Sequence, residues 1–566
     1  MNRFLQSVAP GLFGLSAAIL ALSGCTSQTA APLASSRADV TAALQANVKT
    51  IVVIYAENRS FDNLFGAFPG ANGLGAVLGA DGKPTRAYVP QKDRDGKTVL
   101  ATLPQTWGGV TARGAAPVVN QAQSAGLPNR PFPIETAFQQ AANATLTAST
   151  VTRDLYHRFF ENQMEINGGR NDMFAAWADA GGLTMGHFDY SGSAIYGLAK
   201  QYVLADNFFQ GAFGGSFLNH QYLICACAPE YPDANIAPAK PSVAVLKTDK
   251  KGKYTPQLAT AASSPVSALD GPPSYVMSGN IAPKNYFGDG KFYAVNTMQP
   301  TYQPSGNPPT DADRSLYADP GKATTLPPLS NTTIGDLLTA KGVSWKWYAG
   351  AWDAAVSDGV QAPGLKRKVI YAGDANGVSS AANVDFQAHH QPFNYYAAFD
   401  PVTHAADRAA HLKDYSDLLA DIAGGSLPAV AFYKPEGVYN QHEGYANLAD
   451  GDARIADLIA RLQGSPQWSS MLIVLTYDEF GGVWDHAPPP KGDLLGPGTR
   501  IPAIIISPLA KRGVVDHTQY DTASILRLIS RRFGLDLLPG IAARDGALKA
   551  AHAPPMGDLT NALNLR

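Results

Sequence analysis

The sequence has little charge, and neither sign of charge is in clear excess. Asp, Glu, Lys and Arg make up 16% of its 566 residues, and the formal net charge is -2. Proteins that bind nucleic acid usually carry a basic surface, and this composition gives no sign of one. A hydrophobic content of 45% also excludes a chain that is disordered throughout. The composition therefore predicts a globular protein with a large core and no nucleic-acid partner.

Cysteine is equally scarce, with 3 in the whole chain. That number is too small for a structural zinc site. Cys225 and Cys227 are separated by one residue in "LICACAPEY". They could form a disulfide in an oxidising compartment, although such a short bridge is strained, or they could be two small buried thiols. The spacing leaves both possibilities open.

The N-terminus carries a targeting signal. Arg3 precedes the apolar stretch "GLFGLSAAILALSGC", which is too short and too rich in Gly and Ser for a membrane span, so residues 1–24 are predicted to be a signal peptide. The end of this stretch resembles a bacterial lipoprotein box, which makes Cys25 the expected lipidation site; the alternative is an ordinary signal peptide with a coincidental cysteine. Residues 25–45 are expected to form a flexible tether. We therefore expect an exported protein, in the periplasm or on the outer surface, held to the bacterial envelope by a lipid on Cys25.

Short apolar runs alternate with helical patterns through the rest of the chain. The runs that predict buried strands are "TIVVIYAEN", "VSWKWYAG", "PAVAFYKPEG", "MLIVLTYDEFGG" and "IPAIIISPLA". Helices are predicted within 332–342, 456–468 and 521–534. This alternation indicates an α/β fold with a mainly parallel central sheet flanked by helices. We expect one domain over 46–540, with long insertions at about 75–135 and 228–330 that form a lid or a small subdomain, and a C-terminal tail over 541–566.

Polar residues collect where the predicted strands end. In a parallel α/β sheet, ligands bind beyond the carboxyl ends of the strands. Carboxylate and amide oxygens suit a hard divalent cation, and added histidine nitrogens widen the choice of ion to Mn, Fe or Zn. A single acidic strand end would be explained as a solvated loop, but several in one chain indicate a metal site. The candidate residues are Glu57 and Asn58 after the first strand, Asp478, Glu479, Asp485 and His486 after a later one, and Asn440, His442 and Glu443 after a third.

The turn after the first strand and the segment "GAFGGSFLNH" add further candidate residues to this site. Arg59 and Asp62 are expected to pair and brace the turn after Asn58. Ser216 follows Gly214 and Gly215 and begins a helical pattern. A serine in that position is usually a helix cap. The same position also directs the positive end of the helix dipole at an anion, where a hydroxyl activated by a metal could attack phosphorus.

Histidines lie near each of these segments. A single histidine is more often structural than catalytic, but an adjacent pair in an aromatic loop is harder to explain in that way. Such residues can hold phosphate oxygens or protonate a leaving alkoxide at mildly acidic pH. The candidates are His157, His389, His390 and His442.

Several of these segments together are familiar. "ENRSFDNLFGAFPGANGL", "HRFFENQMEINGGRNDMF", "GAFGGSFLNH", "HHQPFNYY", "NQHEGYANLADGD" and "TYDEFGGVWDHAPPP" resemble, in order, motifs of the bacterial acid phosphatase and phospholipase C family of phosphoesterases, within the alkaline phosphatase-like superfamily. The match runs from about Thr50 to about Leu535.

The resemblance implies a role for each candidate residue. One divalent metal ion of unspecified identity would be held by Glu57, Asn58, Asp478 and Glu479, and by Ser216, which is also the implied nucleophile. The implied residues around the phosphate, in catalytic and substrate-binding roles, are His157, His389, His390 and His442. The family commonly has threonine as nucleophile in its phospholipases C and serine in its acid phosphatases, so Ser216 indicates the phosphatase branch. Many relatives have Pro-Gly after the last histidine, where this chain has Glu443 and Gly444, which changes the expected loop shape.

The function expected from the sequence is that of an exported acid phosphatase, which hydrolyses phosphate monoesters through a phosphoserine intermediate. The alternative is a phospholipase C-type phosphodiesterase that cleaves lipids such as phosphatidylcholine. A sulfatase is disfavoured because the chain has no Cys-x-Pro/Ala-x-Arg signature. A lipoprotein that only binds phosphorylated ligands would leave the set of metal and nucleophile candidates unexplained. The expected partners are a phosphate ester substrate and the membrane that receives the anchor, and the sequence leaves the oligomeric state open.

Overall fold

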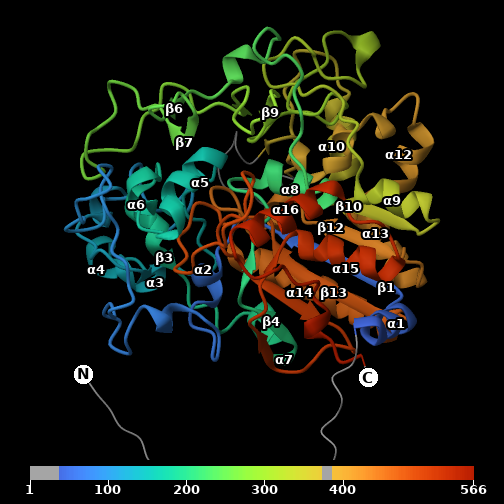
Figure 1. The fold of residues 1–566 in the computed structure, drawn as a ribbon, viewed down its shortest axis with the longest axis horizontal. Helices are drawn as coiled ribbons and strands as arrows, with labels where there is room; N and C mark the ends of the chain where they lie inside the picture. Colours follow the sequence, from blue (N-terminus) through green and yellow to red (C-terminus); the bar gives the residue numbers. More distant parts are fainter. Residues whose placement is uncertain (1–36, 373–384, 566) are drawn as a thin grey trace, which may run out of the picture.

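The computed structural model describes residues 37–372 and 385–565. Cys25 and the signal segment lie outside the described residues. No helix in the described ranges is long and apolar enough to cross a membrane. The described chain folds around one large sheet with helices on its flanks (Figure 1).

The central sheet has eight strands in the order β11-β10-β12-β1-β13-β14-β4-β15. All neighbouring pairs are parallel except those of β14, which runs against both β13 and β4. The fold class predicted from the sequence is therefore confirmed. In order along the sheet the strands are β11 (Leu412–Asp414), β10 (Trp345–Ala349), β12 (Val430–Lys434), β1 (Thr50–Ala56), β13 (Met471–Tyr477), β14 (Ala503–Ile506), β4 (Val203–Ala205) and β15 (Val514–Asp516).

The middle of the sheet is fully buried, as its uninterrupted apolar sequence predicts. Every residue of β1 and β13 is buried. These two strands pair in parallel along their whole length, from Thr50 opposite Met471 to Ala56 opposite Tyr477. On its other side β1 pairs in parallel with β12. The carboxyl ends of β12, β1 and β13 therefore lie next to one another at one edge of the sheet.

Helices cover the sheet in packed groups. One group joins α8 to α9 and α15, and α15 also contacts α1; another joins α7 to α14. The longer helices are α1 (Arg37–Asn47), α5 (Phe159–Ile166), α7 (Ala194–Gln201), α8 (Ser216–Cys225), α9 (Ile334–Ala340), α10 (Trp352–Gly359), α12 (Ala405–His411), α13 (Tyr415–Gly424), α14 (Leu448–Gln463), α15 (Ala523–Phe533) and α16 (Pro539–Ala550). Shorter helices are α2 (Phe61–Phe65), α3 (Ile134–Ala137), α4 (Gln139–Ala142) and α6 (Phe174–Trp177).

The two expected insertions contain little regular structure. The segment 228–330 holds two small hairpins, β6 (Leu246–Thr248) with β7 (Tyr254–Leu258) and β8 (Ile281–Ala282) with β9 (Tyr293–Ala294). It lies at the top of Figure 1, and β7 contacts α5. The segment 75–135 consists of loops, short 3-10 turns and β2 (Phe132–Pro133), which pairs with β3 (Gly186–His187). Away from the central sheet, β5 (Phe208–Phe209) pairs with β16 (Tyr520–Asp521).

Both chain ends are folded in the described residues, and this corrects the expectation of a flexible tether up to residue 45. The described part of the expected tether is helical from Arg37, because α1 packs on α15, where Arg531 donates to the hydroxyl of Thr41 at 2.8 Å. The expected C-terminal tail is folded as well, since it includes most of α16. The buried Arg544 of α16 donates to Asp521 at 2.7 Å and to the carbonyl oxygen of Gly211 at 2.8 Å.

Candidate active site

The end of β1 delivers Glu57 and Asn58 to the carboxyl edge of the sheet. Both are fully buried. The backbone N–H of Glu57 donates to the carbonyl oxygen of Asn440 at 2.9 Å, which ties this strand end to the loop after β12. Asn58 has a φ of 59°, in the left-handed region that asparagine adopts more readily than most residues. This turn points the Asn58 side chain away from the strand direction and toward α8.

The end of β13 delivers Asp478 and Glu479 beside them. Asp478 continues the strand pairing, since its N–H donates to the carbonyl oxygen of Ala56 at 3.0 Å. Its Oδ1 accepts from the N–H of Asn58 at 3.1 Å and from the N–H of Glu479 at 2.9 Å. Glu479 Oε2 accepts from the N–H of Gly481 at 2.6 Å. Both side chains are fully buried and fixed by backbone donors.

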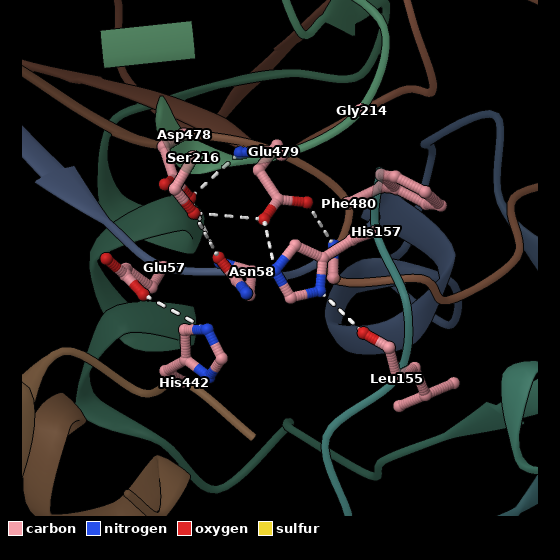
Figure 2. A network of polar contacts seen from close by, with 12 residues as sticks. Glu57, Asn58, Leu155, His157, Gly214, Ser216, His442, Asp478, Glu479 and Phe480 are labelled. Atoms are coloured by element: carbon pink, nitrogen blue, oxygen red, sulfur yellow. Dashed lines mark hydrogen bonds and ion pairs between the residues drawn. The ribbon is translucent and has the colours of Figure 1, made fainter. Parts of the chain in front are cut away.

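Ser216 is the first residue of α8 and faces these two strand ends (Figure 2). Its Oγ lies 3.2 Å from Asn58 Oδ1 and 3.1 Å from Glu479 Oε1. The N-cap of α8 is Gly215, and no side chain caps this helix end within the described ranges. The capping role weighed from the sequence is therefore not what Ser216 does. Instead, its hydroxyl and the unshared N–H groups of the first helical turn are available to an anion.

Glycine is required just before Ser216. Gly214 has a φ of 81°, and a Cβ there would lie 2.3 Å from the backbone nitrogen of Phe159. A side chain would therefore be strained and would also collide with the start of α5. The loop reaches α8 only because its backbone can pass this close to Phe159.

His157 and His442 lie next to each other beside the carboxylates, with ring centroids 5.5 Å apart (Figure 2). The Nδ1 of His157 contacts the carbonyl oxygen of Leu155 at 2.6 Å, and the Nδ1 of His442 contacts that of Glu443. A carbonyl only accepts, so each Nδ1 carries hydrogen. The Nε2 atoms consequently face the acids, at 3.6 Å from Glu479 Oε1 for His157 and 3.7 Å from Glu57 Oε2 for His442.

The neighbouring residues His389 and His390 have different surroundings in the structure. His390 is 2% exposed, and its Nε2 contacts Glu57 Oε1. His389 lines the cavity next to Ser216, whereas His390 does not. The two rings meet edge to face with centroids 4.7 Å apart. His389 is thus placed to touch a ligand, and His390 is placed to hold Glu57.

A cavity of about 280 Å³ opens beside Ser216. Of the residues predicted from the sequence, Ser216, His157, His389 and His442 line it. Its other walls come from several segments: Asp154, Arg158, Gly215, Phe217, Asn280, Asn296, Thr297, Tyr371, Gln387 and Tyr445. A larger cavity of about 1050 Å³, between α1, α15 and α16, holds none of the candidate residues. The small cavity is therefore the candidate active site.

Two site residues were not singled out from the sequence. Lys434, the last residue of β12, is fully buried with its Nζ 3.0 Å from Glu57 Oε1 and 3.6 Å from Asp478 Oδ2. His220, one turn along α8, contacts the carbonyl oxygen of Ser216 at 2.7 Å. A charged residue at the end of an apolar run was the available signal for Lys434, and the helical spacing from Ser216 was the signal for His220.

The expected pair between Arg59 and Asp62 is wrong. Arg59 Nη1 lies 2.5 Å from Glu443 Oε1, and its Nη2 donates to the carbonyl oxygen of Gln441 at 2.7 Å. Arg59 therefore connects the β1 turn to the loop after β12. The loop that departs from the family pattern at Glu443 thus has a partner of its own.

Asp62 belongs instead to a second acidic cluster with Asp485 and His486. The cluster has the composition of a metal site. However, the buried Arg500 donates to Asp62 Oδ1 at 3.1 Å and to Asp485 Oδ1 at 3.0 Å, and His486 Nδ1 lies 2.7 Å from Asp62 Oδ2. Arg500 and His486 together already supply positive charge to these carboxylates. We assign this cluster to structure, not to catalysis.

The electrostatics of the active site depend on burial and on close ion pairs. Burial opposes the charge of Glu57, but His390 and Lys434 outweigh it and hold the pKa of Glu57 well below its usual range. Burial raises the pKa of Glu479 well above its usual range, despite the neighbouring His157. Burial acts against the charge of His157, but the carboxylates of Glu479 and Asp154 raise its pKa to about 10. The site therefore favours the charged forms of Glu57 and His157 and disfavours the charged form of Glu479.

The residues at this edge fit a hard divalent cation. Glu57, Asp478 and Glu479 are fully buried carboxylates, and Lys434 is the fixed cation between the first two. Glu57 Oε2 and Asp478 Oδ2 are buried without a hydrogen-bond donor in the described structure. Asn58 and Ser216 add neutral oxygens, and His389 and His390 could add nitrogens beside Glu57. Such an oxygen-rich set is the kind that Mg²⁺ or Mn²⁺ prefers.

Comparison with known proteins gives a match over most of the chain. The model of the Phosphoesterase family matches residues 48–536. "Phospholipase C A" of Mycobacterium tuberculosis is 26% identical over 251 residues, which are 40% of this chain and 42% of that protein. "Non-hemolytic phospholipase C" of Pseudomonas aeruginosa is 27% identical over 179 residues, covering 26% and 25% of the two chains. The match thus spans less than half the length of these curated relatives.

The comparison with solved structures gives matches with low scores. A lipoteichoic acid synthase from Listeria monocytogenes gives a TM-score of 0.26 at 9% identity, over 72% of this chain and 74% of that one. A phosphonate monoester hydrolase from Silicibacter pomeroyi gives a TM-score of 0.22 at 12% identity, over 64% and 72%. These scores are too low to add anything to the description of the fold.

Proposed function

Because this chain belongs to the phosphoesterase family, we propose that it is an exported, metal-dependent acid phosphatase. In this proposal the enzyme hydrolyses phosphate monoesters through a phosphoserine at Ser216. The observation that carries the proposal is the position of Ser216 Oγ, at the start of α8, at the wall of the 280 Å³ cavity and within 3.2 Å of Asn58 Oδ1 and Glu479 Oε1. A nucleophile, an anion-binding helix end and a set of metal ligands thus meet at one point.

We propose that one divalent cation is held by Glu57, Asn58, Asp478, Glu479 and Ser216. When bound there, the ion would lower the pKa of the serine hydroxyl and offset negative charge on the phosphate. Its identity is left to experiment. The support for this set is the burial of its carboxylates and the two carboxylate oxygens that lack a hydrogen-bond donor.

The residues of the chain then divide the reaction between them. The N–H groups at the start of α8 bind phosphate oxygens, and Ser216 Oγ attacks phosphorus as its proton passes to a neighbouring base such as Glu479 Oε1, 3.1 Å away. The bond from phosphorus to the alcohol oxygen breaks, and a histidine that lines the cavity protonates that oxygen. Water then cleaves the phosphoserine and restores Ser216. Preorganised charge and positioning provide most of the rate.

The histidines have separate roles in this proposal. His157, His389 and His442 line the cavity and are the candidates for phosphate binding and for protonation of the leaving group. His390 was also expected to touch the substrate. Its contact with Glu57 supports a positioning role for it instead.

Two observations favour monoesters over choline-containing diesters. The cavity is small, and its wall carries Arg158 and His157, whose pKa is raised to about 10, against one carboxylate, Asp154; a dianionic monoester gains more there than a ligand with a cationic headgroup. Serine as the nucleophile agrees with the phosphatase branch that the motifs resemble. The second candidate is a phospholipase C-type phosphodiesterase, which the names of the curated relatives favour.

Purified residues 26–566 should be tested with p-nitrophenyl phosphate and p-nitrophenylphosphorylcholine side by side. The expected result is dominant hydrolysis of the monoester at mildly acidic pH. Dominant hydrolysis of the phosphorylcholine ester would establish the second candidate instead. Hydrolysis of neither substrate would contradict both.

The nucleophile can be tested with matched serine variants. Ser216→Ala should abolish turnover, and Ser216→Thr should retain a measurable part of it because a hydroxyl remains. Ser193 also stands at a helix start, where its side chain accepts from the N–H of Tyr196, but at α7 and outside the cavity. Ser193→Ala should therefore keep full activity. Phosphate trapped on Ser216 in acid-quenched wild type would support the intermediate, and turnover by Ser216→Ala would contradict it.

Export and lipidation are a separate part of the proposal. We propose that Cys25 carries a lipid that holds the enzyme to the bacterial envelope. Full-length protein expressed in bacteria should partition into detergent, and Cys25→Ser should move it to the aqueous phase. Partition of both forms into the aqueous phase would contradict the anchor while leaving the enzymatic proposal intact.

A further inference from the structure

Lys434 is a buried lysine between two of the proposed metal ligands. It is fully buried at the end of β12, with its Nζ 3.0 Å from Glu57 Oε1 and 3.6 Å from Asp478 Oδ2. It also donates to the carbonyl oxygen of Ala56 at 3.4 Å and lies 5.3 Å from the centre of the Tyr55 ring. A buried ammonium group is costly unless it is paired, so both carboxylates must contribute to holding it.

We propose that Lys434 is a positioning residue that sets both the geometry and the net charge of the metal site. This inference rests on the proposed function, since it takes Glu57 and Asp478 as metal ligands. Before a metal binds, the positive charge of the lysine offsets the repulsion between these two carboxylates. It also remains beside the metal afterwards and weakens its binding, because two positive charges at this range in a buried site repel strongly.

The location of Lys434 supports a fixed position for its charge. The adjacent strand β1 ends at Ala56, whose carbonyl oxygen accepts from Nζ. The ring of Tyr55 closes another side of the ammonium group. Glu57 follows the neighbouring strand β1, Asp478 follows β13 on the far side of β1, and the lysine reaches both from β12. The ammonium group therefore has no open route to solvent through which it could leave when a metal binds.

The charge of Lys434 also affects how strongly the metal-loaded site attracts the substrate. The three buried carboxylates of Glu57, Asp478 and Glu479 carry three negative charges when ionised. A divalent cation offsets two of them, and Lys434 offsets the third. Removing the lysine makes the loaded site more negative by one charge, which weakens its attraction for an incoming phosphate dianion.

The test compares variants by metal binding and by kinetics. Lys434→Met removes the charge and keeps an apolar side chain, and Lys434→Arg keeps the charge. The matched control is Lys346→Met, which removes a different lysine from an ion pair with Asp421 at 2.6 Å, on the neighbouring strand β10. Binding of Mn²⁺ alone to metal-stripped protein is measured by calorimetry, and the KM for p-nitrophenyl phosphate is measured with the metal in excess.

The expected result has opposite signs in the two measurements. Lys434→Met should bind Mn²⁺ roughly tenfold more tightly than wild type, because a repelling charge is gone. Its KM should rise roughly fivefold, because the loaded site has lost one positive charge that attracts the substrate dianion. Lys434→Arg and Lys346→Met should stay close to wild type in metal affinity. A purely structural lysine would weaken both metal and substrate binding, or change neither.

The outcomes separate this inference from the function on which it rests. If wild type binds Mn²⁺ and hydrolyses the ester but Lys434→Met binds the metal equally or more weakly, the inference is wrong. If wild type neither binds a divalent ion nor hydrolyses the ester, the proposed function is wrong. Should Lys434→Met fold poorly, Lys434→Gln replaces it, because the amide can still donate to Glu57, and the same tighter binding is expected.

Discussion

Arg500 provides a sharp test of the second acidic cluster, because it is a fully buried arginine with several defined partners. Its Nε donates to Asp485 at 3.0 Å and its Nη2 to Asp62 at 3.1 Å, while Nη1 donates to the carbonyl oxygens of Asn72 at 2.6 Å and Asp206 at 2.8 Å. Replacing Arg500 with methionine keeps an apolar stem but leaves Asp485 without its main cation and Asp62 with His486 alone. Breaking a buried ion pair in this way costs about 3–5 kcal/mol of unfolding free energy.

The assay is urea unfolding of the metal-free protein, followed by tryptophan fluorescence. Arg500→Lys should lose less than Arg500→Met, since it keeps a positive charge but not the fork that reaches several acceptors. Arg461→Met is the matched control, because Arg461 pairs with Asp457 at 2.7 Å on the surface of α14. Surface pairs contribute little, so no measurable shift is expected from it.

The pH dependence gives a second check on the same reasoning. Burial raises the pKa of Asp485 to about 6, even with Arg500 beside it. Removing Arg500 should raise that pKa further, so Asp485 takes up a proton on mild acidification and its buried charge disappears. The deficit of Arg500→Met should therefore shrink from about pH 7 to about pH 5. A deficit under about 1 kcal/mol, or one that does not change with pH, would refute the assignment of this cluster to a buried ion-pair network.

Three further perturbations test other parts of the structure. Burial lowers the pKa of His187 from 6.5 to about 4, so the folded protein loses stability as the pH falls from 6.5 toward 4. His187→Gln should remove up to about 3 kcal/mol of this loss, measured by urea unfolding. An unchanged dependence of the unfolding free energy on pH would contradict this prediction. Dialysis against a chelator should abolish hydrolysis of p-nitrophenyl phosphate, and a divalent ion should restore it; full activity of metal-free protein, verified by elemental analysis, would contradict the metal proposal. Gly481→Ala should lower kcat and cost about 1–3 kcal/mol, because φ is +65° and the new Cβ would lie 2.3 Å from the backbone oxygen of Asn58; wild-type kcat would show that this contact does not position Asn58.

The sequence predicted the centre of the fold well, because buried parallel strands have a clear signature. The apolar runs ending at Ala56 and Tyr477 are the two longest strands of the sheet, and both are buried at every position. The short outer strands β4, β11 and β15 have three residues each and carry no comparable pattern. The direction of β14 was also beyond prediction, since an apolar run has the same composition whether it pairs parallel or antiparallel.

The site was predicted in part for a different reason. Residues directly after a strand, such as Glu57 and Asp478, are placed by the strand itself. Partners that come from other segments depend on the tertiary structure. Arg59 was predicted to pair with Asp62, which is close in the chain, but it pairs with Glu443, which is close in space. The pairing of Cys225 with Cys227, which the spacing left open, is present as a disulfide at the end of α8.

The register of the central strands explains why the site forms from residues so distant in sequence. Ala56 lies opposite Tyr477 at the last pair of β1 and β13, so the next residue of each strand, Glu57 and Asp478, must emerge side by side. The contact between Asn58 N and Asp478 Oδ1 spans 420 residues for this reason. A slip of one residue would reverse the faces of a strand that is buried on both sides, which the packing does not allow. The proposed metal ligands therefore come together only when the middle of the sheet is complete, and metal binding should stabilise the folded chain and not an incomplete one.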